Sequence, residues 1–463
     1  METPSKKKES NALELLNDDV LRLILHSLYE ACLRDFDTLE SIRAKHIKAV
    51  KMLLPLGYTS RKFAKLVLPY VWKYARIVTN SSNNLRSHNI EISEILKKDN
   101  LLFPYGEYLK ELEINFTVNS GDEYCIDIPY ISSLLQIIVN RCTNIYQLNF
   151  LAKVEHKNRT EFQMRPKHDD AINQSFKIYM NIYPWNDFRN LVSKAFGQGS
   201  LIEVTLSSDF ILMDDECLIN ITQKNPGIRK LSLRGSQFTN EGIETALQFL
   251  GDSLKELEIY NLLGDGSSRA LRSYPLSINI ETLLRPCRNL QSIHLVGIKY
   301  KPAKLSDKLE SYICPLQSIT INQVDEETLT HLFSVVNKQT LFQVNITNPY
   351  DVIKWDSFFC SSILPFATGG SLENLILFIL RCQNHRYSAY ALDPKIIMKN
   401  IMNTLKISEN TTNLLCSKLK RWRIFVGKDM GDQIYSVESE GVDFVSKTCI
   451  LDYDRLALSE YCY

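Results

Sequence analysis

The stretch Ile228–Leu262, IRKLSLRGSQFTNEGIETALQFLGDSLKELEIYNL, opens and closes on the same apolar pattern. The pattern is L-x-x-L-x-L, and it is met by Ile228, Leu231 and Leu233 and again by Leu254, Leu257 and Ile259. Its fourth and sixth positions point to one side of an extended chain, because side chains alternate along a strand. One such strand cannot bury its apolar side alone, whereas a stack of strands can.

Between these two strands the apolar spacing becomes that of a helix. Four apolar residues fall on one face of this helix: Ile243, Ala246, Leu247 and Leu250. Thr239 or Asn240 can cap its start, and Gly251 stands where such a helix would stop. The stretch therefore predicts one turn of a strand-and-helix coil.

The pattern recurs along the chain. Its first residues are Leu109, Ile145, Leu201, Ile228, Leu254, Leu290, Leu316, Leu341, Leu372 and Leu419. From Leu201 to Leu341 the steps are 27, 26, 36, 26 and 25 residues, close to the roughly 20–29 residues of a leucine-rich repeat. This period predicts an α/β leucine-rich-repeat solenoid, with parallel strands and helices on the convex side, rather than an ordinary α/β domain.

Two parts of the solenoid depart from the period. The gap between Ile145 and Leu201 is two periods long, and alternation around residues 176–180 predicts one degenerate repeat there. After Leu372 the run 391–415 predicts a helical insertion.

The composition of the chain narrows the classes of partner and binding site that we expect. Lys and Arg number 54 against 53 Asp and Glu in 463 residues, which gives no electrostatic reason to expect nucleic acid as a partner. Eleven cysteines without a C-x-x-C pair do not indicate a disulfide framework or a zinc site. No apolar run reaches the roughly 18 residues of a membrane span, and the N-terminus lacks a secretory signal. We expect an intracellular protein, cytoplasmic or nuclear, with no membrane contact.

No motif of a catalytic site is present. The chain lacks a P-loop, H-E-x-x-H, G-x-S-x-G and G-x-G-x-x-G. The triplet His168-Asp169-Asp170 could ligate a metal, but an isolated triplet in a loop is more often solvated surface. We therefore expect no enzyme activity, no cofactor and no metal.

The N-terminal part has helical spacing. Asn17 and Asp18 can cap a first helix, and a second is expected at about 38–54. A third begins near Thr59, with Pro69 breaking or restarting it. The first helix has an apolar face formed by Val20, Leu21, Ile24, Leu25 and Leu28. So small a unit has too few residues to bury much core unless it docks on something.

Two segments of this unit carry a family resemblance. LNDDVLRLILHSL at Leu16–Leu28 resembles the first half of an F-box, and YTSRKFAKLVLPYVWKY at Tyr58–Tyr74 resembles the second half. Asn17 stands where the family usually has proline, and the segment 29–57 is longer than a typical F-box carries. Leucine-rich repeats behind an F-box are a common arrangement, and the leucine-then-asparagine start at Leu16 and Asn17 is similar to many fungal F-box proteins.

The resemblance implies a substrate receptor of an SCF-type ubiquitin ligase. Its helices would dock on the Skp adaptor, which joins the cullin scaffold, and its repeats would hold a target protein. The resemblance places these residues at the adaptor: Leu16, Val20, Leu21, Ile24, Leu28, Leu66, Val71 and Trp72. The alternative is a scaffold whose N-terminal helices only cap the open end of the solenoid.

Cys142-Thr-Asn144 and Cys287-Arg-Asn289 share one spacing before a repeat strand. They look like the cysteine-containing class of leucine-rich repeat found behind F-boxes, where a small thiol suits the tight entry into a strand. With no second ligand nearby, packing is favoured over metal binding.

The concave face is where a target would bind. The third, fifth and seventh positions of L-x-x-L-x-L-x point away from the core, and arginine and aromatic residues are typical interface anchors. We predict target contacts from Arg234, Tyr260, His294, Phe378, Arg421, Arg423 and Phe425. His294 is better interpreted as a contact residue than as a base. A solvated face with its C-terminal part covered by the tail is the alternative.

The expected organisation has five parts. They are a disordered tail at 1–12, an F-box-like helical module at 13–77, a connector at 78–108, the solenoid at 109–427, and a C-terminal tail or cap at 428–463.

Overall fold

The computed structural model describes most of the N-terminal helices and of the repeat array. The residues that it describes are 17–34, 42–78, 105–120, 128–156, 199–208, 214–234, 238–260, 276–300, 314–322, 324–347, 358–381, 421–428, 434–440 and 443–449. Leu16, the triplet 168–170, the strand expected around 176–180 and the insertion expected at 391–415 lie outside these ranges.

The described part of the N-terminal unit, called here the helical module, contains three helices: α1 (Asp18–Arg34), α2 (Ile42–Gly57) and α3 (Arg61–Val71). Asn17 Oδ1 accepts the Asp19 N–H at 3.1 Å, so Asn17 caps the start of α1. Ser60 caps α3 by accepting the Phe63 N–H at 3.2 Å. The third helix runs through Pro69 instead of stopping there, because a proline in the last turn removes only one helical hydrogen bond.

The module has its own small core, separate from that of the repeats. It is made by Leu21, Leu25, Tyr29, Ala49, Leu53, Phe63, Leu66 and Val67.

Within the described ranges, eleven parallel strands follow the module in one open sheet. They are β1 (Tyr74–Val78), β2 (Glu111–Ser120), β3 (Gln147–His156), β4 (Glu203–Ser208), β5 (Lys230–Arg234), β6 (Glu256–Tyr260), β8 (Ser292–Val296), β10 (Ser318–Asn322), β11 (Gln343–Thr347), β12 (Asn374–Arg381) and β13 (Arg421–Lys428). Each pairs only with its neighbours in this order, so the chain advances one strand per turn. The α/β repeat solenoid is therefore confirmed.

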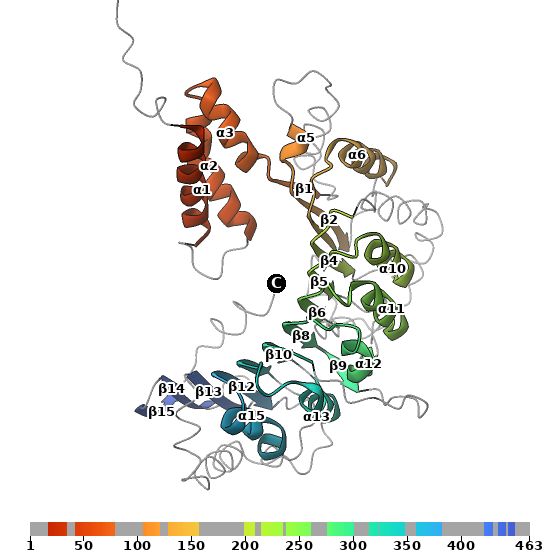
Figure 1. Ribbon diagram of the computed structural model, residues 1–463, viewed down its shortest axis with the longest axis vertical. Helices are drawn as coiled ribbons and strands as arrows, with labels where there is room; N and C mark the ends of the chain where they lie inside the picture. The colour runs from red at the N-terminus through yellow and green to blue at the C-terminus, as the bar shows by residue number, and fades with distance from the viewer. Residues whose placement is uncertain are drawn as a thin grey trace, which may run out of the picture.

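The helices lie on the outer side of the arc that the strands line (Figure 1). They are α5 (Tyr105–Tyr108), α6 (Ile128–Arg141), α10 (Asp215–Lys224), α11 (Asn240–Leu250), α12 (Ile280–Leu284), α13 (Glu326–Val335), the π-helical turn η2 (Phe359–Ile363) and α15 (Leu364–Gly369). Two short strands, β7 (Leu276–Ile278) and β9 (Ile298–Tyr300), form a separate parallel pair.

All ten predicted repeat strands are present, each beginning two residues after the first residue of its pattern. The sheet also begins one strand earlier than the pattern indicates. Trp72, two residues before β1, stands at the first position of the pattern, which is leucine or isoleucine in the other repeats. Ala75 stands at the fourth position, and Tyr74 pairs with Glu111 of β2. β3 pairs directly with β4 in the sheet. The degenerate repeat expected between them falls on residues outside the described ranges, so that expectation stays a prediction.

The core is a set of rows that run from strand to strand. Sixth-position residues form one buried row: Ile77, Ile114, Phe150, Leu206, Leu233, Ile259, Leu295, Ile321, Ile346 and Leu377. The entry to each strand repeats one backbone bond, such as Lys110 N–H to Lys73 O and Lys255 N–H to Arg229 O, both at 2.8 Å.

The two cysteine-containing turns are equivalent in structure. Cys142 and Cys287 are buried, as the packing interpretation predicts, and burial raises the pKa of each thiol to about 12. Asn144 donates to Glu107 O at 3.1 Å, and Asn289 donates to Asp252 O at 2.7 Å. Each asparagine thus ties its turn to the preceding one.

The direction of the sheet reverses after β13. The strands β14 (Ile434–Glu440) and β15 (Asp443–Cys449) continue it as an antiparallel hairpin within the part expected to be a tail or cap.

Candidate functional site

The concave face consists of three rows set by the strand register. Across β5, β6 and β8 the third positions are Lys230, Glu256 and Ser292, and the fifth are Ser232, Glu258 and His294. The seventh positions are Arg234, Tyr260 and Val296. Residues facing one another in a parallel pair lie within side-chain reach, so each row can form contacts between repeats.

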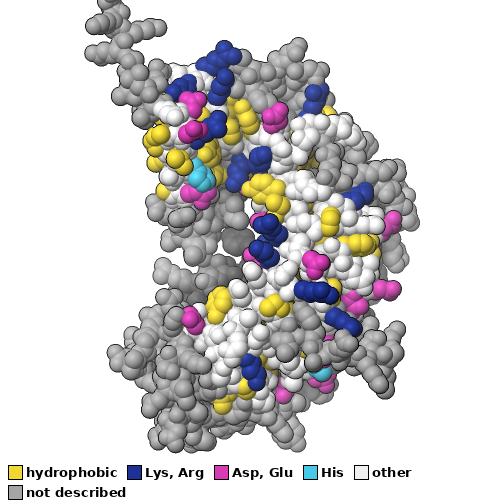
Figure 2. Space-filling model, viewed as in Figure 1, with side chains coloured by type: hydrophobic (Ala, Val, Ile, Leu, Met, Phe, Trp, Pro, Cys, Tyr) yellow, Lys and Arg dark blue, Asp and Glu magenta, His cyan; other side chains and the backbone are white. Residues whose placement is uncertain are grey.

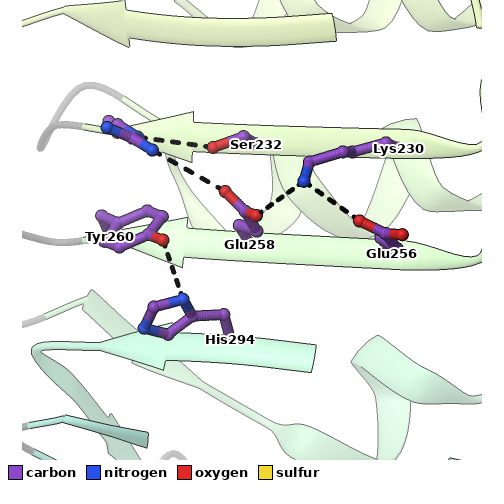
Figure 3. Close-up of polar contacts among 7 residues, drawn as sticks. Lys230, Ser232, Glu256, Glu258, Tyr260 and His294 are labelled. Atoms are coloured by element: carbon purple, nitrogen blue, oxygen red, sulfur yellow. Dashed lines mark hydrogen bonds and ion pairs between the residues drawn. The ribbon is translucent and has the colours of Figure 1, made fainter. Parts of the chain in front are cut away.

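Lys230 holds two carboxylates of the neighbouring strand. Its Nζ lies 3.0 Å from Glu256 Oε2 and 3.1 Å from Glu258 Oε1 (Figure 3). Glu258 is shared, because Arg234 Nη2 lies 3.8 Å from its other oxygen. Two cations and two carboxylates therefore neutralise one another at this point of the face.

Arg234, Tyr260 and His294, which were predicted as target contacts, form one continuous cluster. The Arg234 guanidinium carbon lies 4.5 Å from the centre of the Tyr260 ring, a cation–π contact. The Tyr260 hydroxyl and His294 Nδ1 are 2.8 Å apart, and Figure 3 shows the two rings reaching across neighbouring strands. The structure thus presents an arginine and an aromatic ring already held in place.

Burial sets the charge states of the cluster. It lowers the pKa of His294 to about 4, with Glu258 opposing the change, so the imidazole is neutral near pH 7. It also raises the pKa of Tyr260 to about 12. Burial alone would raise the pKa of Glu258, but Lys230, Ser232 and Arg234 together hold it below its ordinary value.

Neither ring nitrogen of His294 is open to a bound molecule. His294 Nδ1 is engaged by Tyr260, and its Nε2 is buried without a hydrogen-bond partner among the described residues. Neither nitrogen is placed to take a proton from a bound molecule.

Acidification should destabilise the protein through His294. The unfolded side chain titrates near 6.5 and the folded one near 4, so the unfolded state takes up the proton first as pH falls. Stability is then lost between about pH 6.5 and pH 4, and at pH 5 the loss should reach about 1–2 kcal/mol. The free energy of unfolding, measured with urea at pH 7 and at pH 5, gives this loss.

The matched variant is His294→Gln, which keeps a hydrogen-bonding side chain beside Tyr260 but does not titrate. It should lose less stability than the wild type over the same interval. An equal loss in both proteins would assign the effect to carboxylates instead.

Beyond β8 the described concave positions carry no charge. They are Ser318, Thr320, Asn322, Gln343, Asn345, Thr347, Asn374 and Ile376. The strand register continues the rows to Phe378, Arg421, Arg423 and Phe425. Because the side chains of those four residues lie outside the described ones, the predicted target contacts there stay predictions.

The predicted adaptor residues separate into two groups. Val20, Ile24 and Leu28 lie 42%, 41% and 42% exposed along one side of α1. Leu21 and Leu66 are instead buried in the core of the module, at 2% and 5%. We reassign these two as residues that hold the helices together.

Three further observations complete the adaptor group. Leu23, which the sequence analysis left out, extends the exposed side of α1 at 66%. Val71 is half-buried against the core of the module. Trp72 is turned toward the repeats, with its ring centre 4.8 Å from that of Tyr105 in α5.

Sequence reasoning also missed a charged group at the N-terminal end of the concave face, which contains Lys73, Arg76, Glu111 and Glu113. The sequence signal that could have revealed this group is the W-x-x-A-x-I pattern of residues 72–77, a weak form of the repeat pattern L-x-x-L-x-L.

The described residues hold neither a candidate membrane span nor a candidate metal site. No helix among them is long and apolar enough to cross a membrane. Within the same ranges, no group of three or more His, Cys, Asp or Glu side chains is arranged to hold a metal ion.

No family model matches the sequence, and no curated protein matches it. Among solved structures, the crystal structure of the Rad7 and Elc1 complex in yeast aligns with 81% of this chain and 92% of that chain, at 11% identity and a TM-score of 0.29. The repeat fold described above rests on the strand register and not on this similarity.

Proposed function

We propose that this protein is a substrate-recognition subunit of an SCF-type ubiquitin ligase that works in the cytoplasm or nucleus. Its helical module docks on the Skp adaptor and thereby on the cullin scaffold, and the concave face of its solenoid binds a target protein. The chain supplies no catalytic group; it accelerates ubiquitin transfer by raising the local concentration of target lysines.

The exposed side of α1 is the observation that carries the proposal. Val20, Leu23, Ile24 and Leu28 form an apolar stripe, here called the α1 stripe, of which every residue is at least 41% exposed. Figure 2 shows hydrophobic side chains gathered over this outer part of the module. Contiguous exposed apolar surface of this kind is typical of an interaction site.

The alternative, a module that only caps the solenoid, favours a different distribution of apolar residues. A cap places its apolar surface against the end of the array that it covers. Here the module is joined to the repeats through α3 and Trp72, while the α1 stripe remains accessible. The segment Leu16–Leu28, which resembles an F-box, shares residues 18–28 with this same helix.

Co-purification with a Skp adaptor and cullin tests the proposal. The double variant Val20→Asp/Ile24→Asp should reduce adaptor capture at least tenfold, because charges would have to be buried in the interface. Both positions are already partly exposed, so the thermal unfolding of the variant should match that of the wild type.

Phe249→Asp is the matched control, since Phe249 is an exposed apolar residue on α11 of the solenoid. It should retain the adaptor. A wild-type chain that captures neither adaptor nor cullin would refute the ligase role and leave the scaffold.

A further inference from the structure

Only two residues connect the helical module to the sheet. α3 ends at Val71 and β1 begins at Tyr74, which leaves Trp72 and Lys73 between them. Trp72 N–H donates to Leu68 O at 2.9 Å, so the first of the two still belongs to the helix end. The next backbone group, Lys73 O, accepts from Lys110 N–H at 2.8 Å and already belongs to the sheet.

The side chains of these two residues go to opposite faces of the solenoid. Trp72 contacts Tyr105 of α5, on the side of the helices. Lys73 Nζ lies 2.8 Å from Glu111 Oε1, in the third-position row of the concave face. The connection is thus held on both sides of the sheet.

Lys73 also reaches back to the module. Its Nζ lies 5.6 Å from the centre of the Tyr29 ring on α1. Tyr29 is buried, and its ring packs 5.2 Å from that of Tyr70 on α3. One ammonium group therefore touches both the first helix of the module and the second strand of the sheet.

Glu111 is fixed from the repeat side as well. The Tyr146 hydroxyl, one residue before β3, donates to Glu111 Oε1 at 3.0 Å. Burial alone would lower the pKa of Lys73, but the hydrogen bond and charge of Glu111 raise it above its ordinary value. The ammonium consequently stays charged, and this makes both of its contacts stronger in a partly buried setting.

We infer that Lys73 is a positioning residue that fixes the angle between the helical module and the solenoid, through Tyr29 on one side and Glu111 on the other. It belongs neither to the α1 stripe nor to the Arg234–Tyr260–His294 cluster, yet it sets how these two surfaces face each other. The inference does not depend on the proposed function. If that function holds, Lys73 also sets the gap between adaptor and target.

Single-molecule energy transfer between dyes on the two parts tests this. Dyes attached through non-canonical amino acids at Ala31 on α1 and Gln248 on α11 avoid the native cysteines, and both positions are exposed. The wild-type full-length chain should give one narrow distribution of energy-transfer efficiencies. Lys73→Met, which keeps the apolar stem but removes the charge, should broaden this distribution and displace its mean.

Two controls separate positioning from general stability. Lys73→Arg keeps both the ion pair and the cation–π contact and should restore the narrow distribution. Lys230→Met removes a comparable lysine–glutamate pair farther along the concave face and should leave the distribution unchanged.

A Lys73→Met distribution as narrow as that of the wild type would overturn the inference, even if the unfolding temperature fell. Equal broadening by Lys230→Met would also overturn it. Val20→Asp/Ile24→Asp should reduce adaptor capture at least tenfold without altering the distribution of transfer efficiencies, so a failure of the adaptor experiment is distinguishable from a failure of this one.

Discussion

Replacing Gly251 with alanine should destabilise the solenoid by about 2–3 kcal/mol, although helix propensity alone favours alanine by about 0.5–1 kcal/mol. Gly251 follows α11 with ordinary right-handed helical angles, φ −50° and ψ −36°. Its backbone conformation therefore does not require glycine. The reason for glycine here is space.

A Cβ on Gly251 would collide with the carbonyl oxygen of Pro286 and lie 2.9 Å from its carbonyl carbon. Those atoms are backbone of the next turn, and Arg288 N–H fixes that turn by donating to Gly251 O at 3.1 Å. Relief would require two repeats to separate, so the steric cost should exceed the gain in propensity. Chemical denaturation at neutral pH measures the difference.

Gly227 provides the matched control. A Cβ there meets nothing within 4 Å, so Gly227→Ala should be neutral or stabilising by up to about 1 kcal/mol. If Gly251→Ala were as stable as Gly227→Ala, the close approach of the turns at Pro286 would be disproved.

Truncating Phe150 to alanine should cost about 3–5 kcal/mol, the usual loss for a fully buried phenylalanine. Phe150 is among the largest side chains in the core and is completely buried. In its row it faces Ile114 of β2 and Leu206 of β4. The cavity would therefore open between three successive strands.

Hydrogen exchange would show which strands are destabilised by the Phe150→Ala substitution. In a repeat array each unit contacts only its neighbours, so amides of β2 to β4 should exchange faster while those of β10 and β11 keep their protection. Phe342→Ala, at a phenylalanine that is 37% exposed in the same solenoid, should cost under about 0.5 kcal/mol. Uniform loss of protection along the whole sheet would contradict the local picture.

Much of the fold could be predicted because the apolar residues of every repeat have the same role, which is to be buried against the neighbouring repeats. Leu231 and Leu233, and their equivalents, are buried by neighbours that carry the same pattern, so spacing alone reveals the strands. The β1 strand escaped prediction because Trp72 and Ala75 fill the core positions of the pattern, and neither is a residue that marks a repeat.

The candidate site was predictable in position but not in its partners. Counting along the pattern places Arg234, Tyr260 and His294 on one face, and the structure brings them together. That one carboxylate, Glu258, serves both Lys230 and Arg234 depends on zero offset between strands, which spacing does not reveal.

For the first helix, the sequence does not predict which apolar side is buried. α1 is apolar on two adjacent sides, one formed by Leu21 and Leu25 and the other by Val20, Ile24 and Leu28. A period of 3.6 residues predicts both sides equally well, and only packing against α2 and α3 decides which becomes core.

The hairpin of β14 and β15 limits what the end of the sheet can join. A further coil of the same kind, from this chain or from another copy, would have to add its strand parallel to the last one. Reversal of direction at β14 replaces that parallel acceptor with an antiparallel edge, and the spacing of hydrogen bonds differs between the two arrangements. A coil stacked on this end would therefore meet an antiparallel hairpin in place of the last strand of the repeats.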